Sequence, residues 1–370
     1  MNINWALVFI PAHSYVWPMK AQWFGRLFHR AATKDLVLLR QRAGSGDAEA
    51  QYQLALRLGL GHGTAPDHAE AAEWFRRAAE QGHAESQNAL GLCCDEGTGV
   101  AHDAAQADLW YRRAADQGLA AAQNNLGLSY RKGEGVTKDL EEAARWFRLA
   151  AEQGYPDAEY SLGMAYARGE GLMQDNARAV KWLHKAAENG EVNAMHRLAR
   201  ELHKKAEKRS EFREAARWYR AAADQGHVDA IFYLAQLHTE GNGVAENFVE
   251  AAAWLQKAAE QMHAPSQYEL GRRHQAGQGV PPNPAEGAKW FRRAADQGHV
   301  PAQLLLGRCY LEGKGVPLDL TRAYRWFAIA AKLGSKDAAI ERDKITGALT
   351  GEQMVEAKKR IAEFTPQRPG

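Results

Sequence analysis

The chain has 370 residues, with 47 Lys and Arg against 45 Asp and Glu, so its formal net charge at pH 7 is only +2. This balance excludes the strong positive field that drives nonspecific nucleic-acid binding, and nucleic acid is not an expected partner. Cys93 and Cys94 are adjacent and Cys309 lies far along the chain, which is not a disulfide framework and favours a reducing, cytoplasmic location.

The first 47 residues are predicted to form an N-terminal leader and a basic amphipathic helix. The apolar run Trp5 to Ile10 is short, follows no Lys or Arg and stops at Pro11, which is unlike a secretory signal, so the true start could be Met1 or Met19. Between residues 19 and 34, apolar and basic side chains fall on separate helical faces. Two interpretations stay open, a helix that caps the array that follows and peripheral attachment to an anionic membrane surface.

Residues 48–335 contain eight units of 36 residues. Tryptophan marks the same position of every unit, at Trp74, Trp110, Trp146, Trp182, Trp218, Trp254, Trp290 and Trp326. Leucine recurs with the same period, at Leu54, Leu90, Leu126, Leu162, Leu198, Leu234, Leu270 and Leu306. A period in this range is the signature of a solenoid, in which each unit buries the face that its neighbour leaves exposed.

Two helices are predicted in each unit. In the second unit, Gln87, Leu90, Gly91 and Cys94 share one face of a helix over residues 84–96, and Ala107, Trp110, Ala114 and Ala115 share one face of a helix over residues 104–117. The later helix opens after an Asp or Asn that can accept the first free amides, as at Asp103, and an acid or amide three residues on, as at Glu70 and Glu250, predicts capping boxes. Glycines such as Gly97 and Gly118 mark helix ends.

The third unit carries the pattern Ala-Gln-x-x-Leu-Gly followed by Gly-x-Gly-Val and Ala-x-x-Trp-Phe-x-x-Ala-Ala-x-Gln-Gly, and it resembles the Sel-like repeat, a relative of the tetratricopeptide repeat. The resemblance implies an all-α fold, a right-handed αα-superhelix of eight helix-turn-helix units with terminal capping helices. It also implies a protein-interaction scaffold or adaptor, in bacterial regulation or complex assembly, without a catalytic site of its own.

No residue pattern nominates an enzyme, a cofactor or a metal. His83, His227, His263 and His299 occupy one register of the repeat, which favours a structural role, and none of them has a neighbour at metal-ligand spacing. The Gly-x-Gly segments follow helices and recur along the array, so they are turns and not phosphate cradles.

A partner is expected on the outer face of the first helices, which lines the concave surface in related helical repeats. One register reads Tyr52, Asn88, Asn124, Tyr160, His196, Phe232, Tyr268 and Leu304, and the other reads Leu56, Leu92, Leu128, Met164, Arg200, Gln236, Arg272 and Arg308. This pattern predicts a groove whose first half takes an apolar segment and whose second half takes acidic residues of a protein or peptide, on a monomer. The alternative is that these positions are solvated or partly core.

Two places depart from the repeat. The fifth unit has Lys205-Ala206-Glu207-Lys208 where the others have Gly-x-Gly-Val, which predicts a longer basic corner between its helices. Residues 336–370 are predicted to close the array with capping helices and a loose tail, and Thr350 with Gln353 forms a candidate capping box.

Overall fold

The computed structural model describes residues 36–62 and 65–367, and all regular structure within them is helical. Each repeat contributes a first and a second helix. The first helices are α2 (Ala48–Leu60), α4 (Ala84–Glu96), α6 (Ala120–Lys132), α8 (Pro156–Arg168), α10 (Val192–Lys205), α12 (Val228–Glu240), α14 (Ala264–Ala276) and α16 (Val300–Glu312). The second helices are α3 (His68–Glu80), α5 (Ala104–Asp116), α7 (Leu140–Glu152), α9 (Asn176–Glu188), α11 (Arg209–Asp224), α13 (Phe248–Glu260), α15 (Pro284–Asp296) and α17 (Leu320–Lys332).

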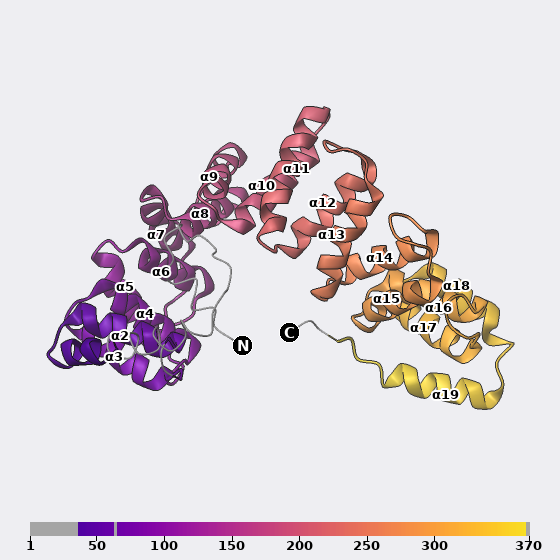
Figure 1. The fold of residues 1–370 in the computed structure, drawn as a ribbon, viewed down its shortest axis with the longest axis horizontal. Helices are drawn as coiled ribbons and strands as arrows, with labels where there is room; N and C mark the ends of the chain where they lie inside the picture. The colour runs from indigo at the N-terminus through magenta and orange to yellow at the C-terminus, as the bar shows by residue number, and fades with distance from the viewer. Residues whose placement is uncertain (1–35, 63–64, 368–370) are drawn as a thin grey trace, which may run out of the picture. The chain divides into compact units, whose positions relative to one another are not determined.

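The chain forms two compact units, residues 1–191 with the first four repeats and residues 192–370 with the last four. Within each unit a helix packs against the next one along the chain, so the αα-hairpins of successive repeats stack as an α-solenoid (Figure 1). The predicted helices at 84–96 and 104–117 are confirmed as α4 and α5.

The core of each repeat is built on the leucine of the first helix and on the residue that follows the tryptophan. Leu90 and Leu126 are fully buried, and so is Phe147. The tryptophans are buried in five repeats and partly exposed at Trp74, Trp110 and Trp182. A Cβ at Gly127 would lie 2.6 Å from the Phe147 ring, which explains why glycine occupies this helical position. In this repeat, therefore, the aromatic ring after the tryptophan fills the space between the two helices.

Buried glutamines join three consecutive helices. The Gln87 side chain on α4 donates to the Ala79 carbonyl at the end of α3 (3.0 Å) and accepts from Gln117 at the end of α5 (2.7 Å). Gln51, Gln123 and Gln267 make the same pair of bonds in their repeats. Each glutamine thereby satisfies backbone and side-chain groups at the seam between one repeat and the next.

In the fourth repeat, Glu159 replaces this glutamine with no exposed surface, and Lys185 compensates. The Lys185 ammonium lies 2.9 Å from the Glu159 carboxylate and donates to the Ala151 carbonyl (3.4 Å). In repeats that have the buried glutamine, the carbonyl in the register of Ala151 accepts from its side chain. The lysine thus replaces the glutamine's bond to this carbonyl, while Asn189 at the end of α9 keeps the other bond and donates to Glu159 at 2.8 Å.

The predicted N-caps of the second helices are confirmed, but the capping boxes that accompany them are wrong. Asp67 and Asn247 accept from the amides of Glu70 and Glu250. The Glu70 carboxylate pairs with Arg40 (2.6 Å), which lies before the first repeat, and the Glu250 carboxylate pairs with Arg220 (2.8 Å) of the fifth repeat, so neither returns to the cap backbone. Each acid connects its repeat to the helical segment that precedes it.

The second glycine of each Gly-x-Gly loop packs against the preceding repeat. Gly135 has φ of +76°, and a Cβ there would lie 2.3 Å from the carbonyl oxygen of Ala104 at the start of α5. Gly99, Gly171, Gly243, Gly279 and Gly315 make the same close approach to the start of the previous second helix. Only glycine fits both the conformation and the contact.

The longer corner predicted for the fifth repeat is wrong. Without glycines to end the helix, α10 continues to Lys205, and α11 begins early at Arg209, so only residues 206–208 connect them. The Glu211 carboxylate accepts from the backbone amides of Glu207 (2.7 Å) and Lys208 (3.2 Å), which fixes the early start of α11.

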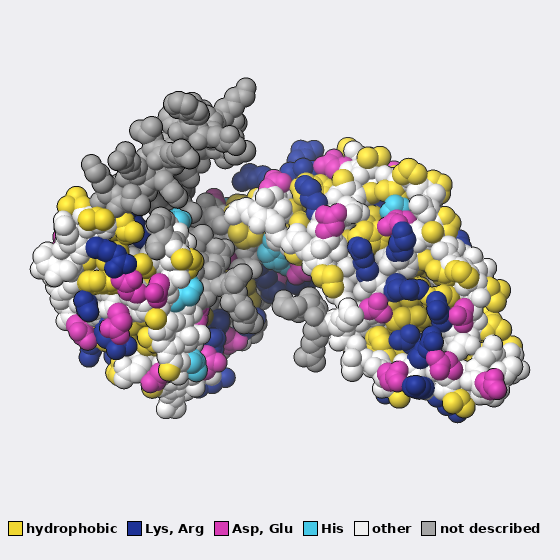
Figure 2. All heavy atoms as spheres, turned by 60° about the horizontal axis from the view of Figure 1, so that its bottom comes forward, with side chains coloured by type: hydrophobic (Ala, Val, Ile, Leu, Met, Phe, Trp, Pro, Cys, Tyr) yellow, Lys and Arg dark blue, Asp and Glu magenta, His cyan; other side chains and the backbone are white. Residues whose placement is uncertain are grey.

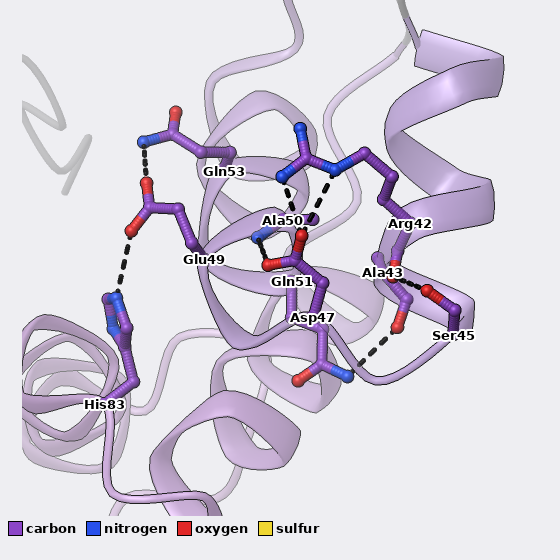
Figure 3. A network of polar contacts seen from close by, with 9 residues as sticks. All are labelled: Arg42, Ala43, Ser45, Asp47, Glu49, Ala50, Gln51, Gln53 and His83. Carbon is purple, nitrogen blue, oxygen red and sulfur yellow. Dashed lines mark hydrogen bonds and ion pairs between the residues drawn. The ribbon is translucent and has the colours of Figure 1, made fainter.

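Both ends of the described chain pack on terminal repeats. Residues 36–44 are helical, and Leu36, Leu39 and Ala43 contact the core of the first repeats. Leu38, which shares the tryptophan register, is 58% exposed. Figure 3 shows Asp47, the N-cap of α2, held by Arg42 at 2.6 Å. The leader and the amphipathic helix predicted for residues 19–34 lie outside the described residues.

At the other end, α18 (Lys336–Thr346) and α19 (Gly351–Ala362) both contact α17. The predicted capping box is confirmed, because Thr350 and Gln353 exchange backbone-to-side-chain bonds. The Phe364 ring lies edge-on to Trp326 at 5.7 Å between centroids.

Candidate partner-binding surface

In the first unit, most of the predicted partner positions lie within the packing of the helices. Tyr52, Asn88, Asn124 and Met164 are each at most 6% exposed. Asn88 accepts from Asn125 of the next first helix (2.9 Å), and Ser161 donates to Asn124 in the same way. Of the others, Leu56 and Leu92 pack partly buried against one core cluster and Leu128 against another, and Tyr160 is half-buried.

In the second unit, the corresponding positions are more open. Arg272 on α14 has a side chain that is 57% exposed and pairs with Glu269 at 3.2 Å. Arg308 on α16 is 42% exposed and pairs with Glu341 of α18 at 3.1 Å. Arg200, Phe232 and Tyr268 are half-buried, and the Tyr268 ring lies 5.9 Å from the Arg272 guanidinium.

A cavity of about 230 Å³ opens on this part of the second unit. Its walls come from α12, α13 and α14, and its lining comprises Phe232, Ala235, Gln236, Thr239, Glu240, Leu255, Glu269 and Arg273. The cavity therefore lies between two successive first helices, next to Phe232 and Arg272 of the predicted groove. Its wall combines an aromatic ring with polar groups, as ligand sites commonly do.

Arg273 is the unusual residue of this lining. It is only 4% exposed, its Nη2 donates to the Thr239 hydroxyl, and its Nε and Nη1 are buried without a hydrogen-bond partner. Burial lowers the pKa of the guanidinium. A buried charged group with unsatisfied donors is costly, and such groups are concentrated at functional sites.

The two glutamates of the lining are engaged elsewhere. The Glu269 carboxylate pairs with Arg272, and Glu240 accepts from Gln236 (2.9 Å) and from Asn242 (2.8 Å). Neither makes a hydrogen bond or an ion pair to Arg273 among the described residues. On the face shown in Figure 2, basic, acidic and hydrophobic side chains of the second unit intermingle.

Sequence reasoning chose Arg272 and missed its neighbour. The register of Arg273 holds Cys93, Leu237 and Cys309 in other repeats, all of them buried. The same register also holds Arg57, Ser129 and Glu201, so the sequence carried no signal that an arginine would be buried at this position.

The structure also brings together three potential metal ligands that their spacing did not reveal. His196 on α10, His227 before α12 and Asp229 on α12 place one donor atom each within 4.8 Å of one another. Burial, with a smaller contribution from His227, lowers the pKa of His196 to about 4. All four histidines of the predicted register have a structural role, because His83, His227, His263 and His299 cap first helices through Nδ1.

Comparison with known families matches the whole repeat array. The Sel1 repeat model matches eight consecutive segments, at residues 48–83, 84–119, 120–155, 156–191, 192–227, 228–263, 264–299 and 300–335. The chain belongs to the Sel1 repeat family. No curated protein matches the chain significantly.

A solved structure of a Sel1 repeat protein agrees with this assignment. A Sel1 repeat protein from Oxalobacter formigenes is 30% identical, with a TM-score of 0.59, over 92% of this chain and 99% of that one. A protective antigen of uropathogenic Escherichia coli with an SLR fold is also 30% identical, with a TM-score of 0.42, over 89% of this chain and 94% of that one.

Sel1 and tetratricopeptide-like repeat proteins are generally protein-interaction scaffolds, and their solenoid fold is typically non-catalytic. Within the described part of this Sel1 repeat protein, no helix has the length and apolar character needed to cross a membrane.

Proposed function

We propose that this Sel1 repeat protein is an interaction scaffold whose second unit binds an acidic segment of a partner protein across α12, α14 and α16. The observation that carries the proposal is Arg273, whose buried guanidinium has two donor nitrogens without partners at the wall of a cavity. Because Arg273 is only 4% exposed, a partner carboxylate would have to enter the cavity to accept from these donors, in a geometry that arginine favours.

The residues around the cavity supply the rest of the contact. Arg272 and Arg308 are exposed enough to reach further acidic side chains. Phe232 and Tyr268 offer aromatic surface of the kind that dominates interface energetics. The groove proposed here is narrower than the one predicted from the sequence, because the positions in the first unit are occupied by packing.

The test uses a photo-crosslinking amino acid in place of the exposed Gln236 at the cavity. Crosslinked material from cells is digested, and mass spectrometry identifies the partner segment. We expect one segment rich in Asp or Glu. A synthetic peptide of that segment should then bind the full chain, with its affinity measured by fluorescence anisotropy.

Two variants and one control decide the result. Arg273→Met should weaken binding of the peptide by about 2 kcal/mol or more, roughly 30-fold, because a buried charged contact is lost. The triple variant Arg200→Glu, Arg272→Glu and Arg308→Glu should also weaken peptide binding. Arg145→Glu, at a side chain that is 69% exposed in the first unit, is the control and should leave affinity unchanged. A neutral or basic segment, or equal affinity for all variants, would overturn the proposal.

A further inference from the structure

The start of the second unit contains a cluster of side chains that metal ions bind. His196 extends from α10 of the fifth repeat, His227 is the N-cap of α12, and Asp229 lies in the first turn of the same helix. The imidazole centroids of His196 and His227 are 4.3 Å apart, and the three donor atoms lie within 4.8 Å of one another. His196 therefore meets two residues that follow it in the sequence by 31 and 33 positions.

The cluster departs from the way the repeat uses its capping histidine. In the first repeat His83 Nε2 contacts the Glu49 carboxylate (3.1 Å), and in the sixth His263 Nε2 contacts Asp229 (3.3 Å). For His227 the residue in this register is Asn193. The other capping histidines pack against Tyr52, Phe232 or Tyr268, whereas His227 packs against a second imidazole, that of His196. The fifth repeat thus supplies a histidine where the other three supply a tyrosine or phenylalanine ring.

His196 adds an independent observation. It is 9% exposed, and its Nε2 is a buried atom without a hydrogen-bond partner. The Tyr233 ring stacks on it at 5.9 Å between centroids, and Tyr219 lies at 6.1 Å. These contacts hold the ring in place, and a buried polar atom of this kind requires an explanation.

We propose that His196, His227 and Asp229 bind a divalent transition-metal ion, with Zn²⁺ as the best fit, and leave a coordination position open. Two imidazoles and one carboxylate are donors that Zn²⁺ accepts, and three protein ligands with an open fourth position are typical of non-structural zinc sites. Because Nδ1 of His227 accepts from the Ala230 amide at 3.3 Å, the ion would be bound through Nε2.

The charges around the cluster are mixed. Asp229 favours a cation, whereas Arg200 and Arg197 of α10 oppose it, and Arg197 is paired with Glu201 at 3.2 Å. Asp229 also faces His263, and that histidine would orient the carboxylate from outside the site. The ion would connect α10 to α12, and so join the fifth repeat, which lacks the glycine loop, to the sixth.

The test is titration of the chelator-treated full chain with ZnCl₂ in a calorimeter and with CoCl₂ by visible absorption. We expect one equivalent of Zn²⁺ to bind and raise the thermal unfolding midpoint, and Co²⁺ to develop absorption bands of a low-coordinate nitrogen and oxygen site. His196→Asn and His227→Asn should each reduce affinity at least about tenfold.

Both replacements suit their positions. Asn88 and Asn124 occupy the register of His196, and Asn is a good N-cap in place of His227, so circular dichroism should show an unchanged fold. His299→Asn, which removes a capping histidine outside the cluster, is the matched control and should bind Zn²⁺ like the original chain. Failure of the original chain to bind Zn²⁺ or Co²⁺, or equal binding by all four proteins, would overturn the proposal.

Discussion

Replacing Arg273 with methionine is expected to stabilise the second unit while removing the proposed contact. The position accepts an apolar side chain, because Leu237 occupies the same register one repeat earlier and is fully buried. Methionine retains the unbranched stem of arginine and adapts to irregular spaces. The variant therefore separates what the guanidinium contributes to folding from what it contributes to binding.

The expected change in the free energy of unfolding follows from the contacts of the Arg273 guanidinium. The unsatisfied Nε and Nη1 cost about 1 to 3 kcal/mol each, and their removal is favourable. Against this stand the bond to Thr239, worth about 1.5 to 3 kcal/mol, and the contact with the Phe248 ring, worth about 0.5 to 1 kcal/mol. Thr239 retains its bond to the Ala235 carbonyl. The net expectation is a gain of about 1 kcal/mol.

Urea unfolding followed by tryptophan fluorescence measures the change. Because a solenoid can unfold in parts, hydrogen exchange of the amides of α14 gives the free energy of unfolding of that helix. Arg272→Met, on the same helix but at a mostly exposed position, is the control and should change stability by less than about 0.5 kcal/mol. A loss of more than about 1 kcal/mol in Arg273→Met would show that the fold itself satisfies the guanidinium, and would refute the reasoning.

Three further predictions concern the repeat seams. Met262→Gly should stabilise the chain by about 1 kcal/mol, because Met262 has φ of +65°, and the reciprocal Gly226→Met, where a Cβ meets no neighbour, should destabilise it similarly in urea unfolding. Lys185→Met should cost about 1 to 3 kcal/mol in the same assay, since it leaves the buried Glu159 carboxylate without its cation and with the Asn189 amide as its partner, and the second change Glu159→Gln should restore stability. Burial lowers the pKa of the His299 imidazole below 6.5. The contribution of neutral His299 to the stability of the fold is therefore complete above pH 6.5 and is lost as the pH falls through the lowered pKa. His299→Asn should reduce this loss of stability at low pH, measured by thermal unfolding at about pH 5 to 8.

Each of these has an outcome that contradicts it. Equal stabilities for the glycine and methionine forms at both positions would mean that the left-handed conformation costs nothing there. Failure of the glutamine change to rescue Lys185→Met would assign the loss to packing of the lysine stem. An unchanged pH profile in His299→Asn would show that the cap tolerates protonation.

The sequence predicted the helices well because their ends are fixed by local chemistry. Asp103 and Gly97 determine where α5 begins and α4 ends, and the Leu90 register identifies the face that meets the partner helix of the same repeat. Where such signals are missing, as in the fifth repeat, the expected corner was wrong.

The candidate site was less predictable because periodicity within one helix does not give the angle at which the next repeat packs. Asn88 was therefore assigned to the surface, although it bonds to Asn125 of the following first helix. Arg273 and the cluster of His196, His227 and Asp229 depend on contacts between repeats, which a single-repeat pattern does not contain.

The glycine loops have a consequence for synthesis. The loop containing Gly135 rests on the backbone at Ala104, and Gly279 rests on Phe248, so in each case the supporting helix comes earlier in the chain. During translation every such loop leaves the ribosome after the helix that receives it. The repeats can therefore fold one after another from the amino terminus. Each new hairpin packs on a repeat that has already folded, and folding can begin before the carboxyl end of the chain has been synthesised.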